Sequence, residues 1–145
     1  MTEADLAAVA NIEKQVFSDP WSVGSFRSAL RGSGVAGFVV PADGAIDGYG
    51  ICRAAADEGE ILNLAVRPER RHRGLGRELA TAMLDWMAGQ GALQVYLEVR
   101  SSNAAAIGLY RALGFAIHGV RKDYYQSPRE DAVIMKRDRA DRPAG

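Results

Sequence analysis

The chain has 145 residues, of which 48% are hydrophobic and 25% charged, and its 18 basic and 18 acidic side chains give a formal net charge of zero. This length and composition predict one soluble globular domain over residues 1–137, and the balanced charge argues against direct nucleic-acid binding. The single cysteine, Cys52, excludes an internal disulfide, and no apolar run is long enough to cross a bilayer. We therefore expect a cytoplasmic protein without membrane contact.

Two amphipathic helices are expected at the start of the chain. Leu6, Val9, Ile12 and Val16 recur at steps of three and four and form the apolar stripe of the first helix. Ser22 is a suitable N-cap for a second, shorter helix, because its hydroxyl can accept a hydrogen bond from a free backbone N–H. Both helices should pack one face onto the rest of the domain.

Strand signals then alternate with turns and one long helix. The short turns predict an antiparallel meander of three strands at about residues 37–40, 46–53 and 61–66. A helix over residues 74–88 and a buried strand over 92–99 come next. A strand, a helix and a strand in this order imply a parallel crossover.

The C-terminal part of the chain predicts a helix and a final hairpin. Ser101-Ser102-Asn103 supplies cap residues for a helix over residues 104–113. Strands are expected over 115–123 and 131–136, with a loop over 124–129 between them. The fold class is therefore α/β, with a mixed sheet and flanking helices. Residues 138–145 are charged and are expected to form a disordered tail.

A basic turn with two glycines lies between the third strand and the long helix. Residues 71–76 read RHRGLG and open that helix. A helix start leaves about four N–H groups unpaired, and glycine lets a ligand approach the backbone closely. With positive charge from Arg71, Arg73 and Arg77, the turn is a candidate cradle for a pyrophosphate. The alternative is a solvated basic loop that precedes an ordinary helix.

A second group of polar residues surrounds the end of the strand at 92–99. Glu98 lies in this otherwise apolar strand, where a carboxylate either faces a cleft or costs stability. Asn103, Ile107 and Tyr110 share one face of the following helix. Together they are candidates for an active site at the carboxyl ends of parallel strands. The alternatives are an ion pair of Glu98 with Arg100 or another arginine, a helix cap for Asn103 and a core position for Tyr110.

These stretches resemble the GNAT superfamily of acyl-CoA N-acyltransferases and, within it, the ribosomal-protein-alanine N-acetyltransferase (RimI) family. The likeness extends over most of the chain, from about Leu6 to Met135. The segments that carry it are Pro20–Ser22, Asn63–Val66, Arg71–Gly76, Leu97–Arg100, Asn103–Ile107, Leu109–Tyr110, Leu113–Phe115, Tyr124–Tyr125 and Arg129–Ala132.

The resemblance implies a GNAT fold and transfer of acetyl from acetyl-CoA to the N-terminal α-amino group of a protein. Alanine of a ribosomal protein is the expected acceptor, and no metal is expected. A lysine side chain or a small amine is the alternative acceptor. An acyl-CoA-binding module without turnover and an RNA-binding arginine patch are the alternative functions.

The resemblance also implies roles for individual residues. Glu98 is expected to act as general base through a water, and Tyr110 to protonate the departing thiolate. Trp21, Tyr124 and Tyr125 are expected to hold the acceptor. The implied contacts with acetyl-CoA are Leu64, Ala65, Val66, Arg71, His72, Arg73, Gly74, Leu75, Gly76, Arg77, Asn103 and Tyr110.

The start of the chain departs from the family pattern. GNAT domains usually begin with a strand, whereas this chain begins at the first helix. We therefore expect that the first strand is missing or that the start is displaced. Gly37–Val40 would then form an exposed sheet edge, which proteins normally protect.

Overall fold

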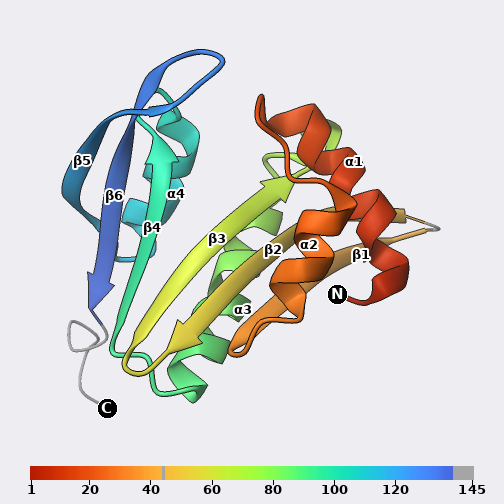
Figure 1. The fold of residues 1–145 in the computed structure, drawn as a ribbon, viewed down its shortest axis with the longest axis horizontal. Coiled ribbons are helices and arrows are strands. Elements are labelled where there is room, and N and C mark those ends of the chain that lie inside the picture. The colour runs from red at the N-terminus through yellow and green to blue at the C-terminus, as the bar shows by residue number, and fades with distance from the viewer. Residues whose placement is uncertain (44, 139–145) are drawn as a thin grey trace.

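The computed structural model describes residues 1–43 and 45–138, which fold around one mixed β-sheet (Figure 1). The helices are the 3₁₀ helices η1 (Glu3–Asp5) and η2 (Pro68–Arg70) and the α-helices α1 (Leu6–Val16), α2 (Val23–Leu30), α3 (Leu75–Gly89) and α4 (Ala104–Ala112). The strands are β1 (Val35–Ala42), β2 (Ala45–Ala55), β3 (Glu58–Val66), β4 (Gln94–Arg100), β5 (Ala116–Tyr125) and β6 (Glu130–Asp138). Their order in the sheet is β1-β2-β3-β4-β6-β5.

The predicted order of elements is confirmed. β1, β2 and β3 form an antiparallel meander, β3–α3–β4 is a parallel crossover, and β5 and β6 form the final hairpin. The loop predicted over residues 124–129 is wrong in part, because Tyr124 and Tyr125 are the last residues of β5. Asp138, where we expected a tail to begin, is the last residue of β6, and residues 139–145 lie outside the described part of the chain.

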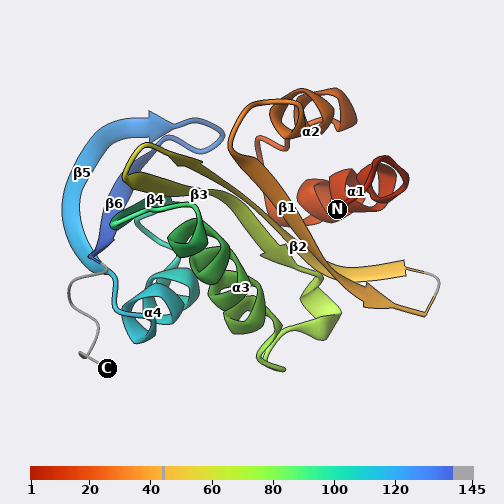
Figure 2. The ribbon, with the colours of Figure 1, turned by 90° about the horizontal axis from the view of Figure 1, so that it is seen from below.

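One layer of helices covers each face of the sheet (Figure 2). α1 and α2 bury an apolar cluster that includes Phe26 and Tyr49, and α3 and α4 bury a second cluster that includes Met83 and Leu97. The predicted cap of α2 is confirmed, since the Ser22 hydroxyl accepts a hydrogen bond from the Ser25 N–H at 3.0 Å. None of the described helices is long and apolar enough to span a membrane.

β1 forms one edge of the sheet, and no strand precedes α1 among the described residues. Gly37–Val40 lies in this edge strand, as expected, but its residues are half-buried and not fully exposed. Leu30 of α2 lies against Gly37, and the backbone nitrogen of Met1 donates to the Gly37 carbonyl at 3.0 Å. Pro41, which has no N–H to offer a further strand, stands at a bulge and is exposed.

β3 and β4 pair over only part of their length and then diverge (Figure 1). Their parallel pairs run from Glu58–Gln94 to Ile61–Leu97, and no pair joins Leu62–Val66 to β4. On its other side β3 stays paired with β2 as far as Val66, with a bulge that leaves Leu62 without a partner. A bulge bends its strand and increases the local twist. The backbone of Leu62–Val66 that faces β4 therefore has no strand partner.

Candidate active site

α3 begins beside the carboxyl end of β3 with an uncapped N-terminus. Its N-cap is Gly74, which has a left-handed backbone (φ 78°) and no side chain to cap the first turn. The first amide bonded within the helix is that of Glu78, which donates to the Gly74 carbonyl at 3.0 Å. Arg71, His72 and Arg73 are exposed around this helix start. Unpaired amides, positive charge and the helix dipole together suit a bound pyrophosphate.

Glycines leave the space beside the helix start open. A Cβ added at Gly74 would meet no atom within 4 Å, and the nearest atom to one at Gly76 would belong to Leu109, at 3.5 Å. Leu75 is half-buried and Arg77 is exposed, so the predicted cradle residues surround one open surface. The residues present therefore fit the diphosphate of acetyl-CoA.

Gly74→Ala should raise the KM for acetyl-CoA about five- to thirtyfold, because a left-handed alanine costs roughly 1–2 kcal/mol and the first-turn amides would shift to relieve it. Steady-state kinetics at saturating acceptor would measure this. Gly89→Ala is the matched control, since Gly89 lies at the other end of the same helix and its Cβ would also meet no atom within 4 Å. An equal rise in both variants would show that the helix start does not bind the cosubstrate.

The end of β3 presents a second part of the predicted cosubstrate site. Leu64 and Val66 point toward α3, and each lies 4.0 Å from a Cβ built on Gly76, whereas Ala65 is buried under the helices on the other face. Arg71 Nε lies 3.4 Å from the Val66 carbonyl oxygen and brings the basic turn against the strand. The unpaired strand backbone and the helix start are therefore adjacent.

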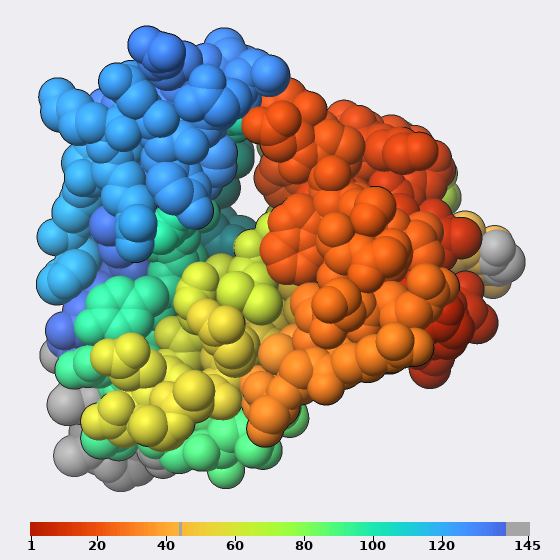
Figure 3. All heavy atoms as spheres, in the orientation of Figure 1, coloured from red at the N-terminus to blue at the C-terminus, as the bar shows by residue number. Residues whose placement is uncertain are grey.

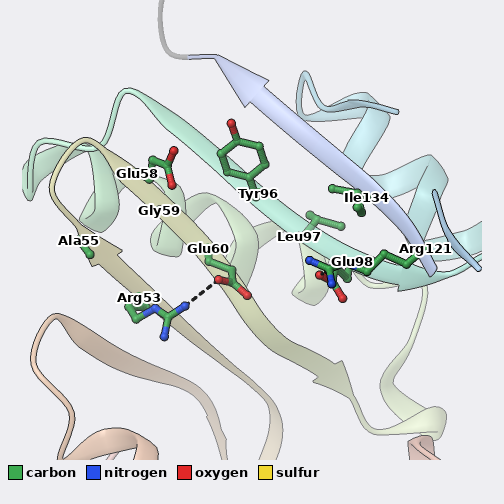
Figure 4. Close-up of a pocket in the computed structure, with 10 residues that line it drawn as sticks. All are labelled: Arg53, Ala55, Glu58, Gly59, Glu60, Tyr96, Leu97, Glu98, Arg121 and Ile134. Carbon is green, nitrogen blue, oxygen red and sulfur yellow. Dashed lines mark hydrogen bonds and ion pairs between the residues drawn. The ribbon is translucent and has the colours of Figure 1, made fainter. Parts of the chain in front are cut away.

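Glu98 lies on β4 and faces the side of the sheet opposite to Leu97 and Val99. It lines an open depression of about 310 Å³ on that face (Figure 4). Its Oε1 lies 3.1 Å from Nε of Arg121 on β5. Glu98 therefore forms an ion pair, as one of the sequence interpretations predicted, and its partner is Arg121. Because the Arg121 side chain is 57% exposed, it can move aside without leaving a core position.

Two of the predicted acceptor residues stand beside Glu98 at the end of β5. The negative charge of Glu98 raises the pKa of Tyr124, whose side chain is exposed. Burial raises the pKa of Tyr125 to about 12. The two rings pack edge to face with centroids 5.1 Å apart, and the Arg121 guanidinium lies 5.5 Å from the Tyr124 ring centroid. An acceptor near Glu98 would thus meet both tyrosines.

Trp21, the third predicted acceptor residue, lies on the connection between α1 and α2 and is half-buried against Phe26, with ring centroids 5.2 Å apart. Figure 3 shows an opening between the N-terminal helices, in red and orange, and the β5–β6 hairpin, in blue. Two segments form the rims of this opening: the α1–α2 connection, residues 17–22, and the end of β5 with the turn that follows it, residues 124–129. The structure therefore places the predicted acceptor residues on segments that face each other.

Arg100, the last residue of β4, joins the two rims. Its guanidinium donates to the carbonyl oxygens of Gln126 and Pro128 at 2.9 and 3.0 Å, and to the Ser18 hydroxyl at 3.0 Å. From the sequence, Arg100 was expected in a family motif and as one possible ion-pair partner of Glu98, but that partner is Arg121. The available signal was its position two residues after Glu98, which places both side chains on one face of the strand.

Glu130 anchors the end of the same turn. Its carboxylate accepts hydrogen bonds from the Ser102 N–H at 2.6 Å and the Ser101 hydroxyl at 3.1 Å, and it lies 3.3 Å from Arg100 Nη1. Hydrogen bonding, first from Ser102, lowers the pKa of Glu130 to about 2. The folded pKa is below the ordinary 4.5, so the carboxylate stabilises the fold above pH 4.5, and this stabilisation is lost as the pH falls toward 2.

Glu130→Gln should therefore lower the melting temperature at pH 7, and the difference from the original protein should disappear near pH 2. Circular dichroism melts between pH 2 and pH 7 would test this. Glu58→Gln, at an exposed carboxylate on β3, is the control and should melt like the original protein. A Glu130→Gln difference that does not change with pH would contradict the assignment.

Tyr110 lies on α4 and Asn103 is the N-cap of that helix, which packs on the other side of the sheet from Glu98. Tyr110 is 6% exposed and packs edge to face on Phe115 at 5.5 Å, and burial raises its pKa. Among the described residues, no hydrogen bond involves its hydroxyl. Asn103 caps α4, because its Oδ1 accepts from the Ala106 N–H at 3.1 Å. Tyr110 is therefore a core residue and Asn103 is a helix cap, as the alternative interpretations predicted. The roles of both residues toward acetyl-CoA stay predictions.

No group of three or more His, Cys, Asp or Glu residues that could hold a metal ion is found in the part of the chain that the structure describes. The candidate site consists of the backbone amides that open α3, Glu98, Tyr110 and the two rims. Such a site can bind an extended ligand with a phosphate end, exchange protons with it and receive a second, extended substrate from the opposite side.

Known proteins share both the sequence and the fold. Residues 6–115 match the Acetyltransferase (GNAT) family. The chain is 38% identical over 133 residues to the [ribosomal protein bS18]-alanine N-acetyltransferase of Escherichia coli (strain K12), covering 90% of this chain and 89% of that protein. It is 37% identical over 147 residues to the N-alpha-acetyltransferase RimI of Mycobacterium tuberculosis, covering 97% and 91%.

Solved structures agree. The crystal structure of the ribosomal-protein-S18-alanine N-acetyltransferase from Escherichia coli superimposes on this chain with a TM-score of 0.88 at 36% identity. The superposition covers all of this chain and 93% of the Escherichia coli chain. Ard1 from Thermoplasma volcanium gives a TM-score of 0.88 at 27% identity, covering 95% and 93%. The family match over most of the chain and these relatives lead to one conclusion: this protein belongs to the GNAT family of acetyltransferases and is close to the RimI enzymes.

Proposed function

We propose that this protein transfers the acetyl group of acetyl-CoA to the α-amino group of the N-terminal alanine of a ribosomal protein, the bS18 of its own organism. The observation that carries this proposal is the divergence of β3 and β4 between Glu98 on one face and Tyr110 on the other. The names of its relatives support the choice of acceptor. A ribosomal acceptor implies a cytoplasmic enzyme.

The two substrates would approach from opposite sides of the diverging strands. The amides that open α3 would hold the diphosphate of acetyl-CoA, and the unpaired backbone of Leu62–Val66 would pair with its extended pantetheine arm. The acceptor would enter between the rims that carry Trp21 and Tyr124. Its amine and the thioester then meet where the strands separate, which lowers the barrier by orientation.

Glu98 would prepare the amine for attack. An α-amino group has an ordinary pKa of about 8, so much of it is protonated at neutral pH, and one proton must leave before the nitrogen can react. The carboxylate of Glu98 is partly exposed and can accept this proton through a water once Arg121 moves aside. The neighbouring Tyr124 and Tyr125 would exclude other water from the amine.

The transfer itself needs one donor for the oxyanion and one for the sulfur. The C–N bond forms and the C–S bond breaks, and a backbone N–H of Leu62–Val66 can stabilise the charge on the carbonyl oxygen between these events. The hydroxyl of Tyr110 would give its proton to the departing thiolate. A tyrosine hydroxyl has an ordinary pKa of about 10, so it is protonated at neutral pH and has a proton to donate.

Transfer would be direct, without an acetylated enzyme. Cys52 is fully buried in β2, and burial raises the pKa of its thiol to about 12. A protonated, inaccessible thiol is a poor nucleophile. Acetyl found on Cys52 after incubation with acetyl-CoA alone would contradict this step.

A peptide panel tests the proposed function. Peptides with the bS18 N-terminal sequence would carry alanine, serine, glycine or methionine at the first position, and a matched alanine peptide would carry a blocked α-amine with its lysines free. Release of free CoA and mass-spectrometric location of the acetyl group are the readouts. We expect acetyl only on free α-amines, with alanine preferred. Transfer to lysine in the blocked peptide, or binding of acetyl-CoA without turnover, would refute the proposal.

A further inference from the structure

Glu13 on α1 is a buried carboxylate for which the proposed reaction has no use. Its exposed fraction is 1%, and it is the one buried charged side chain in the described residues. It accepts hydrogen bonds from the Trp21 N–H at 2.9 Å, from Nδ2 of Asn63 at 3.1 and 3.2 Å, and from the Tyr49 hydroxyl. Three separate elements of the fold therefore donate to one side chain.

Stability alone does not account for this carboxylate. Its partners are neutral donors, and no ion pair to Glu13 is found among the described residues. Burial raises the pKa of Glu13, which reflects the cost of holding its charge away from water. Apolar residues of similar volume often stabilise a core as well as a buried charge does. A network of satisfied hydrogen bonds, in contrast, fixes one arrangement of the groups that form it.

The groups that Glu13 fixes belong to two parts of the candidate site. Trp21 lies on the α1–α2 rim, and the bond to its N–H holds the backbone of that rim. Asn63 follows Leu62, the bulged residue of β3, at the point where β3 leaves β4. One carboxylate is thus bonded at the same time to the acceptor rim and to the strand that would hold the thioester.

We propose that Glu13 is a positioning residue that sets the acceptor rim at a fixed distance from the β3 bulge. The inference rests on the proposed function, because the distance matters only if an acceptor amine must meet a thioester there. In this role Glu13 transfers no proton and contacts neither substrate.

The pattern of the first helix contains a signal for this role. Residue 13 is seven positions after Leu6 and four after Val9, so it lies on the apolar stripe that packs onto the sheet. A carboxylate at a core position of an amphipathic helix requires buried donors, and the sequence does not say which groups supply them.

Glu13→Leu is the main test, since leucine fills the site but accepts no hydrogen bond. We expect kcat/KM for the acceptor peptide to fall by about tenfold or more, with the KM for acetyl-CoA changed by less than about twofold. Glu13→Gln should keep at least about half of the activity, because its carbonyl can still accept from Trp21 while its amide donates to Tyr49 and to a turned Asn63 amide.

Tyr49→Phe is the matched control. It removes one hydrogen bond from the same carboxylate without touching either the rim or β3, and should leave kcat/KM within about twofold. Asn63→Ala removes only the hydrogen bonds between Glu13 and β3, and it should lower kcat. This variant still tests the inference if Glu13→Leu does not fold. Equal losses in Tyr49→Phe and Asn63→Ala would overturn the inference.

Hydrogen exchange at the Trp21 amide provides a readout that needs no acceptor. The amide should exchange slowly in the original protein and in Tyr49→Phe, and about tenfold faster or more in Glu13→Leu. Unchanged exchange in Glu13→Leu would overturn the inference. If no peptide were acetylated by the original protein, the proposed function would fail, and the exchange result would still decide whether Glu13 holds the rim.

Discussion

Glu98→Gln should lower kcat by about 10²–10⁴-fold at neutral pH, because general-base catalysis contributes that much and the amide cannot accept the amine proton. The KM for acetyl-CoA should stay nearly constant, since Glu98 lies on the face of the sheet opposite to Tyr110 and α4. Initial rates of CoA release with the alanine peptide would measure both values. Part of the activity should return at high pH, where the free amine needs no base.

Arg121→Gln is the control that separates a base from a structural ion pair. Both variants remove the ion pair between Glu98 and Arg121. The Arg121 side chain is largely exposed and Glu98 partly so, and ion pairs at the surface contribute only about 0–1 kcal/mol, so Arg121→Gln should keep most of the turnover. Equal loss of turnover in the two variants would show that Glu98 acts through the ion pair and not as a base.

Tyr110→Phe should lower kcat by about a hundredfold, within the range for loss of a general acid. The ring keeps its packing on Phe115, and only a hydroxyl without a protein hydrogen bond among the described residues is lost. The melting temperature should therefore change little. Stopped assays with acetyl-CoA and the alanine peptide, beside a thermal melt of each protein, would test both statements.

The affinity of Tyr110→Phe for CoA decides between a proton donor and a binding residue. A general acid acts on the departing thiolate, so its removal should leave the dissociation constant of CoA, measured by calorimetry, close to the original value. A loss of affinity as large as the loss of kcat would instead assign Tyr110 to cosubstrate binding. A large fall in melting temperature would assign it to the core alone.

Much of the fold followed from local sequence signals. The stripe of α1 and the Ser22 cap of α2 depend on residues within one or two turns of each other. The left-handed backbone of Gly74 and the uncapped start of α3 likewise follow from a few neighbouring residues. These signals were sufficient to predict the order of strands and helices and to propose a pyrophosphate cradle, and a family resemblance then named the expected chemistry.

The tertiary structure decided which side chains meet. The Glu98 carboxylate pairs with Arg121 of β5, and Arg100 bonds Ser18 from 82 positions away. The length of β5 was also misjudged, because Tyr125 is held in the strand by pairing with Glu130 across the hairpin.

The sequence by itself therefore determined the elements and pointed to the candidate cradle at the start of α3 and to the candidate base and acid. Only the tertiary structure revealed the partners of Glu98, the two rims joined by Arg100, and the bond of Glu13 to Asn63, 50 positions away. The physical reason is that caps, turns and amphipathic stripes form between near neighbours in the chain. Contacts between distant residues depend instead on the register, twist and packing of the whole sheet.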